Sequence, residues 1–267
     1  MYLGGVPYIP QEAKGFQMLT IVLATQKGGS GKSTLAIGLA LAAIQTGHTV
    51  RLIETDSQGT LSSWQRRRAG AEPMVESIYA AGNLERRLQS LGNSGVTLTI
   101  IDTAGGVSAV TASAIRHADL CLIPTRPSVA DIEAAASTLQ AARAWNKPFA
   151  IVLNQTPIRG QRIANAANIL GNGGALDLTG VLAQPFIVMR NDHQDALNAG
   201  LAVSEYAPQS KSADEIRGLW QWVEAKLNAR AAQHPTVGGR PASSSIAPSI
   251  FLQATADAAP PASWSGL

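Results

Sequence analysis

A glycine-rich loop stands between an apolar run and a helix-like run near the start of the chain. The run Leu19–Leu23 is apolar, and residues 35–44 are rich in Leu, Ala and Ile. Between them lies the string Lys27-Gly28-Gly29-Ser30-Gly31-Lys32-Ser33-Thr34. A strand, a glycine-rich loop ending in Gly-Lys-Ser and a helix are typical of a P-loop, whose glycines let backbone N–H groups approach phosphate oxygens. The chain is therefore predicted to bind a nucleotide.

The loop residues have separate predicted roles. Residues 28–34 form the predicted phosphate cradle, to which the positive end of the following helix dipole contributes. The amine of Lys32 is expected to reach the β- and γ-phosphates, and the hydroxyl of Ser33 to ligate Mg²⁺. Lys27 is a second lysine that an ordinary P-loop does not need. ATP and Mg²⁺ are the predicted ligands.

Apolar strands alternate with helix-like segments along the rest of the chain. Predicted strands cover residues 49–54, 96–101, 120–123, 149–153 and 186–189. Predicted helices cover residues 61–69, 84–91, 107–117, 128–145, 161–170 and 192–199, and Ser212-Ala213-Asp214-Glu215 reads as a capping box that opens a last helix. This alternation predicts an α/β fold with a mostly parallel sheet and helices on both faces.

Composition divides the chain into three predicted parts. Residues 1–17 form a disordered leader, and Met18 is an alternative start directly before the first strand. Residues 18–232 form a single P-loop ATPase domain, and residues 233–267 form an Ala/Pro/Ser-rich tail with too little apolar surface to order itself.

Charge and cysteine content restrict the classes of function. The chain has 267 residues and a net charge of +3, which permits nucleic-acid binding through a local patch but does not require it. The single cysteine, Cys121, cannot form an internal disulfide or a cysteine cluster within one chain, which indicates a cytosolic protein. No apolar stretch is long enough to span a bilayer, and no signal peptide is expected.

Polar side chains follow several of the predicted strands. Asp56 comes two residues after the second strand, Asp102 directly follows the run 98–101, and Asn154 directly follows the run 150–153. Because ligands bind at the carboxyl ends of parallel strands, we expect these residues to converge with the P-loop on one site. An apolar strand ending in an aspartate is typical of a Mg²⁺-binding Walker B motif, which makes Asp102 the second predicted metal ligand.

These motifs together resemble the ParA/MinD family of deviant Walker A ATPases, and within it the ParA-type partition proteins. The resemblance covers residues 18–230. The two-lysine loop, the segment from Glu54 to Gly59 and the segment from Asp102 to Gly106 resemble three of that family's motifs. Glu54 and a serine replace an aspartate and a proline of the second motif, and the third lacks the family's proline.

The resemblance implies a role for each matching residue. Lys27 would reach the nucleotide of a partner subunit, and Asp56 would position the attacking water, so both are candidate catalytic residues. Asn154 would read the adenine edge. Its structural alternative is an Asx-turn at the end of the strand.

The resemblance also implies a function and partners. The protein would dimerise with ATP, bind non-specific DNA through Arg159, Arg162 and Arg190, and hydrolyse ATP slowly under the control of a ParB-like or other cargo-adaptor protein. It would be a cytoplasmic, nucleoid-associated protein that positions or segregates a plasmid, a chromosome or another cargo, with no membrane contact. Two alternatives remain open: a metabolic P-loop enzyme that activates a small molecule, and a MinD-like membrane positioner, which needs a basic amphipathic helix that the tail lacks. DNA binding with ATP compared with ADP distinguishes them.

Overall fold

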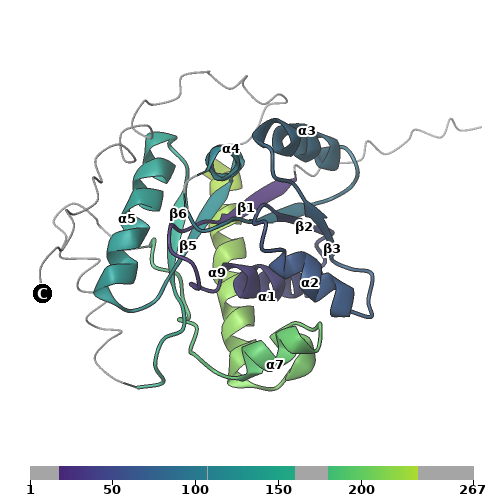
Figure 1. Cartoon of the computed structure of the whole chain (residues 1–267), viewed down its shortest axis with the longest axis vertical. Coiled ribbons are helices and arrows are strands. Elements are labelled where there is room, and N and C mark those ends of the chain that lie inside the picture. The colour runs from purple at the N-terminus through teal and green to yellow at the C-terminus, as the bar shows by residue number, and fades with distance from the viewer. Residues whose placement is uncertain (1–17, 107, 160–179, 234–267) are drawn as a thin grey trace, which may run out of the picture.

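The computed structural model describes residues 18–106, 108–159 and 180–233 (Figure 1). The predicted leader, the predicted helix at 161–170, Arg162 and the predicted tail from residue 234 onward lie outside these ranges. The described elements are β1 (Leu19–Leu23), α1 (Lys32–Gln45), β2 (Val50–Glu54), α2 (Thr60–Arg67), β3 (Met74–Ser77), α3 (Ala81–Gly92), β4 (Leu98–Asp102), α4 (Ala109–His117), β5 (Leu120–Thr125), α5 (Val129–Ala144), β6 (Phe149–Leu153), α7 (Asp192–Asn198), α8 (Val203–Tyr206) and α9 (Lys211–Gln233).

The strands form one six-stranded parallel sheet in the order β3-β2-β4-β1-β5-β6. In this register Asp102 of β4 lies opposite Leu23 of β1 and Glu54 of β2. The last residues of β1, β2 and β4 are therefore level with one another. The segments that follow these strands, including the P-loop after β1, therefore lie together at the carboxyl ends of the strands.

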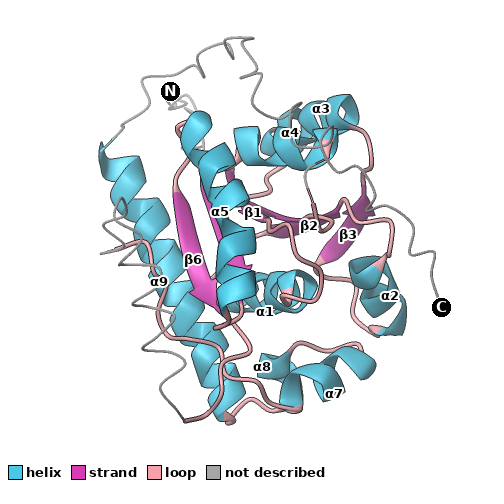
Figure 2. Ribbon diagram, turned by 60° about the vertical axis from the view of Figure 1, so that its left-hand side comes forward, coloured by secondary structure: helices cyan, strands magenta, loops and turns pink. Residues whose placement is uncertain are grey.

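Helices cover both faces of the sheet (Figures 1 and 2). Side chains of a strand alternate between the faces, so Ile21 and Leu23 pack in one core with α1 and α9, whereas Val22 packs in another core with α3, α4 and α5. Cys121 is buried in this second core. The predicted α/β class, with a parallel sheet between two layers of helices, is confirmed.

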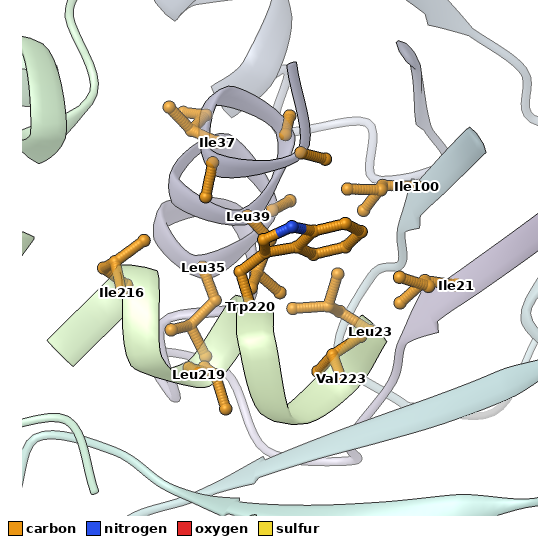
Figure 3. Close-up of a cluster of buried hydrophobic side chains, with 14 of the residues drawn as sticks. Ile21, Leu23, Leu35, Ile37, Leu39, Ile100, Ile216, Leu219, Trp220 and Val223 are labelled. Carbon is orange, nitrogen blue, oxygen red and sulfur yellow. The ribbon is translucent and has the colours of Figure 1, made fainter. Parts of the chain in front are cut away.

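The last helix fastens the P-loop helix to the sheet. The indole of Trp220 on α9 lies between α1 and the strands, close to Leu39 and Ile100 (Figure 3). It is 1% exposed, and its Nε1 donates a hydrogen bond to Thr46 Oγ1 at 2.9 Å. A buried tryptophan contributes a large apolar area, and the satisfied N–H avoids a desolvation penalty. The core therefore fixes α1, whose first residue is Lys32.

One predicted strand is absent, and two elements of the structure were not predicted. Residues 186–189 form no strand, because only Val188 makes an isolated bridge, to Thr156. Gln155 has a φ of 53°, which ends the extended backbone of β6 and leaves a neighbouring segment no continuous strand to pair with. The edge strand β3 and the short helix α8 were not predicted.

The predicted capping box of the last helix is also wrong. α9 begins at Lys211, and the backbone N–H of Ala213 donates to Ser210 Oγ at 3.2 Å, so Ser210 rather than Ser212 is the capping side chain. Ser212 instead donates to Asp192 Oδ2 at 2.8 Å, which ties α9 to α7. Among the described helices, none is both long and apolar enough to cross a membrane.

Candidate nucleotide-binding site

The P-loop leaves its inner backbone groups free for an anion. Gly29 and Gly31 have φ values of 73° and 86°, a left-handed region that favours glycine. Gly31 is the N-cap of the 14-residue helix α1, and no side chain caps that helix. No backbone hydrogen bond among the described residues uses the N–H groups of residues 28–31. The loop and the uncapped first turn of α1 thus present unpaired donors together, as a phosphate cradle requires.

Lys32 is buried at the base of this cradle. It is 7% exposed, and the structure records no carboxylate within ion-pair distance of it among the described residues. Burial lowers the pKa of Lys32, an effect that the negative charges of Asp102 and Asp56 partly offset. A desolvated amine without a close counter-ion gains strongly from a phosphate, because charge-assisted hydrogen bonds are the strong ones.

Ser33 and Asp102 meet as the sequence predicts for two metal ligands. The Ser33 hydroxyl donates to Asp102 Oδ2 at 2.5 Å, and the other carboxylate oxygen, Oδ1, is buried without a hydrogen-bond partner. Burial raises the pKa of Asp102 to about 7, against the opposing effects of the Ser33 hydrogen bond and the charge of Lys32. An unpaired buried carboxylate oxygen is costly, and a divalent cation beside it would supply the missing partner.

Glu54 and Asp56 have different surroundings although they are two residues apart. The carboxylate of buried Glu54 accepts the backbone N–H of Leu61 at 2.6 Å and of Ser62 at 3.3 Å, so it caps α2. Asp56 is half-buried, and among the described residues its carboxylate accepts only the N–H of Gln58, at 2.9 Å. The charge of Asp56 is thus left available to the site, whereas that of Glu54 is used to hold the loop.

Lys27 is engaged within its own chain. Its Nζ lies 3.1 Å from Asp131 Oδ1 on the first turn of α5, and Arg126 lies at the same distance from that oxygen. Burial alone would raise the pKa of Asp131, but hydrogen bonds from Ser128, Lys27 and Arg126 hold this pKa below its usual value. The Lys27 side chain is 40% exposed, so its amine lies at the surface rather than inside the cradle.

Asn154 lies beside the P-loop as predicted, but its amide contacts protein groups. Nδ2 donates to the carbonyl of Ser30 at 2.7 Å, and Oδ1 accepts the N–H of Gln155 at 2.9 Å. An Asx-turn is not formed, since that turn uses the N–H two residues further on. The amide retains one donor and one acceptor position.

Sequence reasoning missed two residues that support the loop. Gln155 Nε2 donates to the carbonyl of Gly29 at 2.9 Å. Gly105 packs so closely on the P-loop that a Cβ there would lie 3.3 Å from Gln26 O and Gly28 N. The two consecutive glycines 105 and 106 could have indicated that another backbone segment packs closely there. The sequence around Gln155 contains no motif that indicates its contact with the P-loop.

The three predicted DNA-binding arginines are not equivalent. Arg159 is exposed. Arg190 is 19% exposed and lies 2.7 Å from Glu215 Oε2, so part of its charge is neutralised within the chain. Arg162 lies outside the described residues.

The residues of the site fit ATP with Mg²⁺. The unpaired P-loop donors and Lys32 suit phosphate, and the Ser33–Asp102 pair suits a hard cation that takes oxygen ligands. The described residues hold no cluster of three or more His, Cys, Asp or Glu that could bind a metal alone. Mg²⁺ is commonly held by one or two protein oxygens together with phosphates.

The sequence matches one protein family profile and several individual relatives. Residues 17–169 match the profile of the VirC1 protein family. Protein ParA of Rhizobium radiobacter is 32% identical over 127 residues, which cover 46% of this chain and 55% of ParA, so the chain spans about half the length of this relative. The maintenance of carboxysome distribution protein A of Halothiobacillus neapolitanus is 27% identical over 208 residues, 75% of this chain and 94% of that protein.

A solved structure shows the same fold. The ATP complex of McdA from Cyanothece superposes with a TM-score of 0.62 at 18% identity, and the match covers 80% of this chain and 98% of McdA. The family profile covers more than half of this chain, and it includes the P-loop, Asp56, Asp102 and Asn154. The chain therefore belongs to the VirC1 protein family, within the ParA/MinD family of P-loop ATPases.

Proposed function

We propose that residues 18–232 form a ParA-type ATPase domain that dimerises with ATP, binds non-specific DNA and positions a cargo. The observation that carries the proposal is the pair of lysines in one loop. Lys32 is buried at the base of the cradle, whereas Lys27 lies at the surface. A single nucleotide needs only the first lysine, so the second is available to a nucleotide on a facing subunit.

Each residue then has a defined task. The P-loop amides and Lys32 bind the triphosphate, and Ser33 with Asp102 would hold Mg²⁺, which neutralises charge on the β- and γ-phosphates when bound. Asp56 orients the attacking water. Lys27 leaves Asp131 and crosses the interface, while Arg126 remains at 3.1 Å and continues to neutralise that carboxylate. A ParB-like or other adaptor protein stimulates hydrolysis and so releases the dimer.

Replacing Asp56 should separate ATP binding from hydrolysis. We expect Asp56→Ala to keep wild-type ATP affinity and to slow hydrolysis by at least about 100-fold, because a water-positioning group acts on the chemical step. The bound ATP then persists, so the dimer accumulates. Phosphate release and size-exclusion chromatography with ATP measure the two effects.

The matched control keeps the local hydrogen bond. Asp56→Asn retains an oxygen for the N–H of Gln58, which lies 2.9 Å from Asp56 Oδ1, but removes the charge. Asp56→Asn should hydrolyse ATP as slowly as Asp56→Ala. Wild-type hydrolysis by either variant would assign water activation to another residue.

DNA binding should depend on the nucleotide. The net charge of +3 is small, so binding requires a local patch, and dimerisation doubles the phosphate contacts on one face. We expect the wild type to bind random-sequence duplex with ATP and much more weakly with ADP. Log affinity should fall with log salt at a slope of about −0.9 per phosphate contacted.

The arginine assignment is tested by a charge-matched pair of triple variants. Replacing Arg159, Arg162 and Arg190 by alanine should remove most of the binding and flatten the salt slope, with ATP affinity unchanged. Replacing Arg66, Arg86 and Arg143, which are exposed on α2, α3 and α5, removes the same charge and should change binding little. Equal DNA affinity with ATP and ADP, or none with either, would favour the metabolic enzyme.

A further inference from the structure

Two amide side chains after β6 hold the carbonyl side of the P-loop. Asn154 Nδ2 lies 2.7 Å from the Ser30 carbonyl, and Gln155 Nε2 lies 2.9 Å from the Gly29 carbonyl. We propose that Asn154 and Gln155, here named the amide clamp, are positioning residues that orient the P-loop peptides for triphosphate binding. This inference rests on the proposed nucleotide site and adds to it a role for Gln155 and a second role for Asn154.

The planarity of the peptide bond transmits the effect of the clamp. In a trans peptide the carbonyl of one residue and the N–H of the next point in opposite directions. A donor that holds the Gly29 carbonyl therefore turns the N–H of Ser30 away from the clamp, and the bond to the Ser30 carbonyl does the same for the N–H of Gly31. These two N–H groups make no backbone hydrogen bond to another described residue.

Without such a restraint the loop peptides would rotate readily. Glycine has an unusually wide range of backbone conformations, and three of the four residues at positions 28–31 are glycines. Ordering their peptides only when the phosphate arrives would reduce the affinity, because the entropy loss is then part of the binding step. A clamp fixed by the fold supplies this order before the ligand binds.

The clamp itself is rigid. Asn154 is 5% exposed, and its Oδ1 accepts the backbone N–H of Gln155 at 2.9 Å, so its side-chain amide is held between the backbone of Gln155 and the P-loop. Gln155 has a φ of 53°, a left-handed conformation that costs energy for a residue with a side chain. Glycine would relieve this strain, yet the position holds a glutamine whose side chain reaches the loop.

Close contact with the clamp explains a glycine of the loop. A Cβ on Gly31 would lie 2.3 Å from Asn154 Nδ2 and 3.6 Å from Gln155 Nε2. The two amides therefore lie directly over Gly31, and only a residue without a side chain leaves room for them. Base recognition by Asn154 does not account for this packing, because it requires no contact with the loop.

The experiment compares ATP with inorganic tripolyphosphate, which has no base. Calorimetric titrations with Mg²⁺ would measure both affinities for the wild type, Gln155→Gly, Asn154→Ala and the exposed control Gln140→Ala on α5. We expect Gln155→Gly and Asn154→Ala each to reduce the affinities for ATP and for tripolyphosphate by a similar factor of about fivefold. This factor corresponds to the typical free-energy contribution of one hydrogen bond. Gln140→Ala should change neither.

Thermal unfolding separates positioning from a purely structural role. Gln155→Gly removes the strained left-handed side chain, so its unfolding temperature should equal or exceed that of the wild type while its tripolyphosphate affinity falls. Gln155→Asn keeps an amide and tolerates the left-handed backbone. It should bind tripolyphosphate more tightly than Gln155→Gly does.

Three results would overturn the inference and are distinguishable from one another. Unchanged tripolyphosphate affinity in Gln155→Gly would show that Gln155 does not order the cradle. Weakened ATP binding with unchanged tripolyphosphate binding in Asn154→Ala would show that this residue acts on the base alone. If the wild type bound neither ligand, the proposed nucleotide site would be wrong, and the clamp would fail with it.

Discussion

Replacing Lys32 by alanine is expected to reduce ATP affinity by about 30- to 4000-fold. Lys32 is 7% exposed, and burial lowers its pKa, so the side chain is already largely desolvated before the nucleotide binds. Truncating one partner of a buried charge pair typically costs about 2–5 kcal/mol, which corresponds to this range. Equilibrium binding of a fluorescent ATP analogue measures the loss.

Two controls make this result specific. Lys32→Met keeps the length of the side chain without its charge and should lose as much affinity as the alanine variant. Lys226 lies beside Leu120 and Phe149, the first residues of β5 and β6, and therefore at the opposite ends of the strands from the P-loop. Lys226→Ala should keep wild-type ATP affinity. Wild-type affinity in Lys32→Ala would exclude the P-loop as the nucleotide site.

Replacing Lys27 by alanine is expected to abolish ATP-dependent dimerisation and to leave ATP binding by the monomer unchanged. The Lys27 side chain is 40% exposed, and the buried Asp131 carboxylate keeps Arg126 as a partner, so Lys27 can leave the ion pair at low cost. At a dimer interface its charge offsets repulsion between the phosphates of two chains. ATP hydrolysis should fall together with dimerisation.

A substitution at Asp131 is not a suitable control for Lys27. The Asp131 carboxylate also accepts hydrogen bonds from Arg126 and Ser128 at the start of α5, so its loss would disturb that helix. Lys27→Gln is preferable, since it keeps most of the side chain and a polar end but no charge. It should fail to dimerise in the same way as Lys27→Ala.

The strands of the buried sheet could be predicted because their signal is local. β1 and β6 have the predicted bounds, and each is an apolar run that the fold buries on both faces. β3 escaped prediction because it is an edge strand whose four residues are all exposed or half-buried, so it lacks an apolar run. The capping residue of α9 was not predicted correctly because Ser210 and Ser212 are chemically equal candidates. Only the contact of Ser212 with Asp192 distinguishes them.

The chemistry of the site was more predictable than its supporting contacts. Ser33 and Asp102 each belong to a local motif, and the structure brings them to 2.5 Å from each other. Asn154 and Gln155 contact P-loop residues that lie 124 and 126 positions away in the sequence. The ion pair between Lys27 and Asp131 of the same chain also joins residues far apart in the sequence. No local pattern encodes such contacts, because they depend on how β1, β5 and β6 are placed side by side.

The molar mass of the protein with bound ATP tests the proposed function most directly. Light scattering would be measured on Asp56→Ala, which preserves ATP, and on the double variant with Lys27→Ala. With ATP we expect Asp56→Ala to have twice the 27.8 kDa mass of one chain, and with ADP the mass of one chain. The double variant should bind ATP and remain at one chain mass. A single-chain mass for Asp56→Ala saturated with ATP, or a dimer of the double variant, would contradict a nucleotide-sandwich dimer built on Lys27.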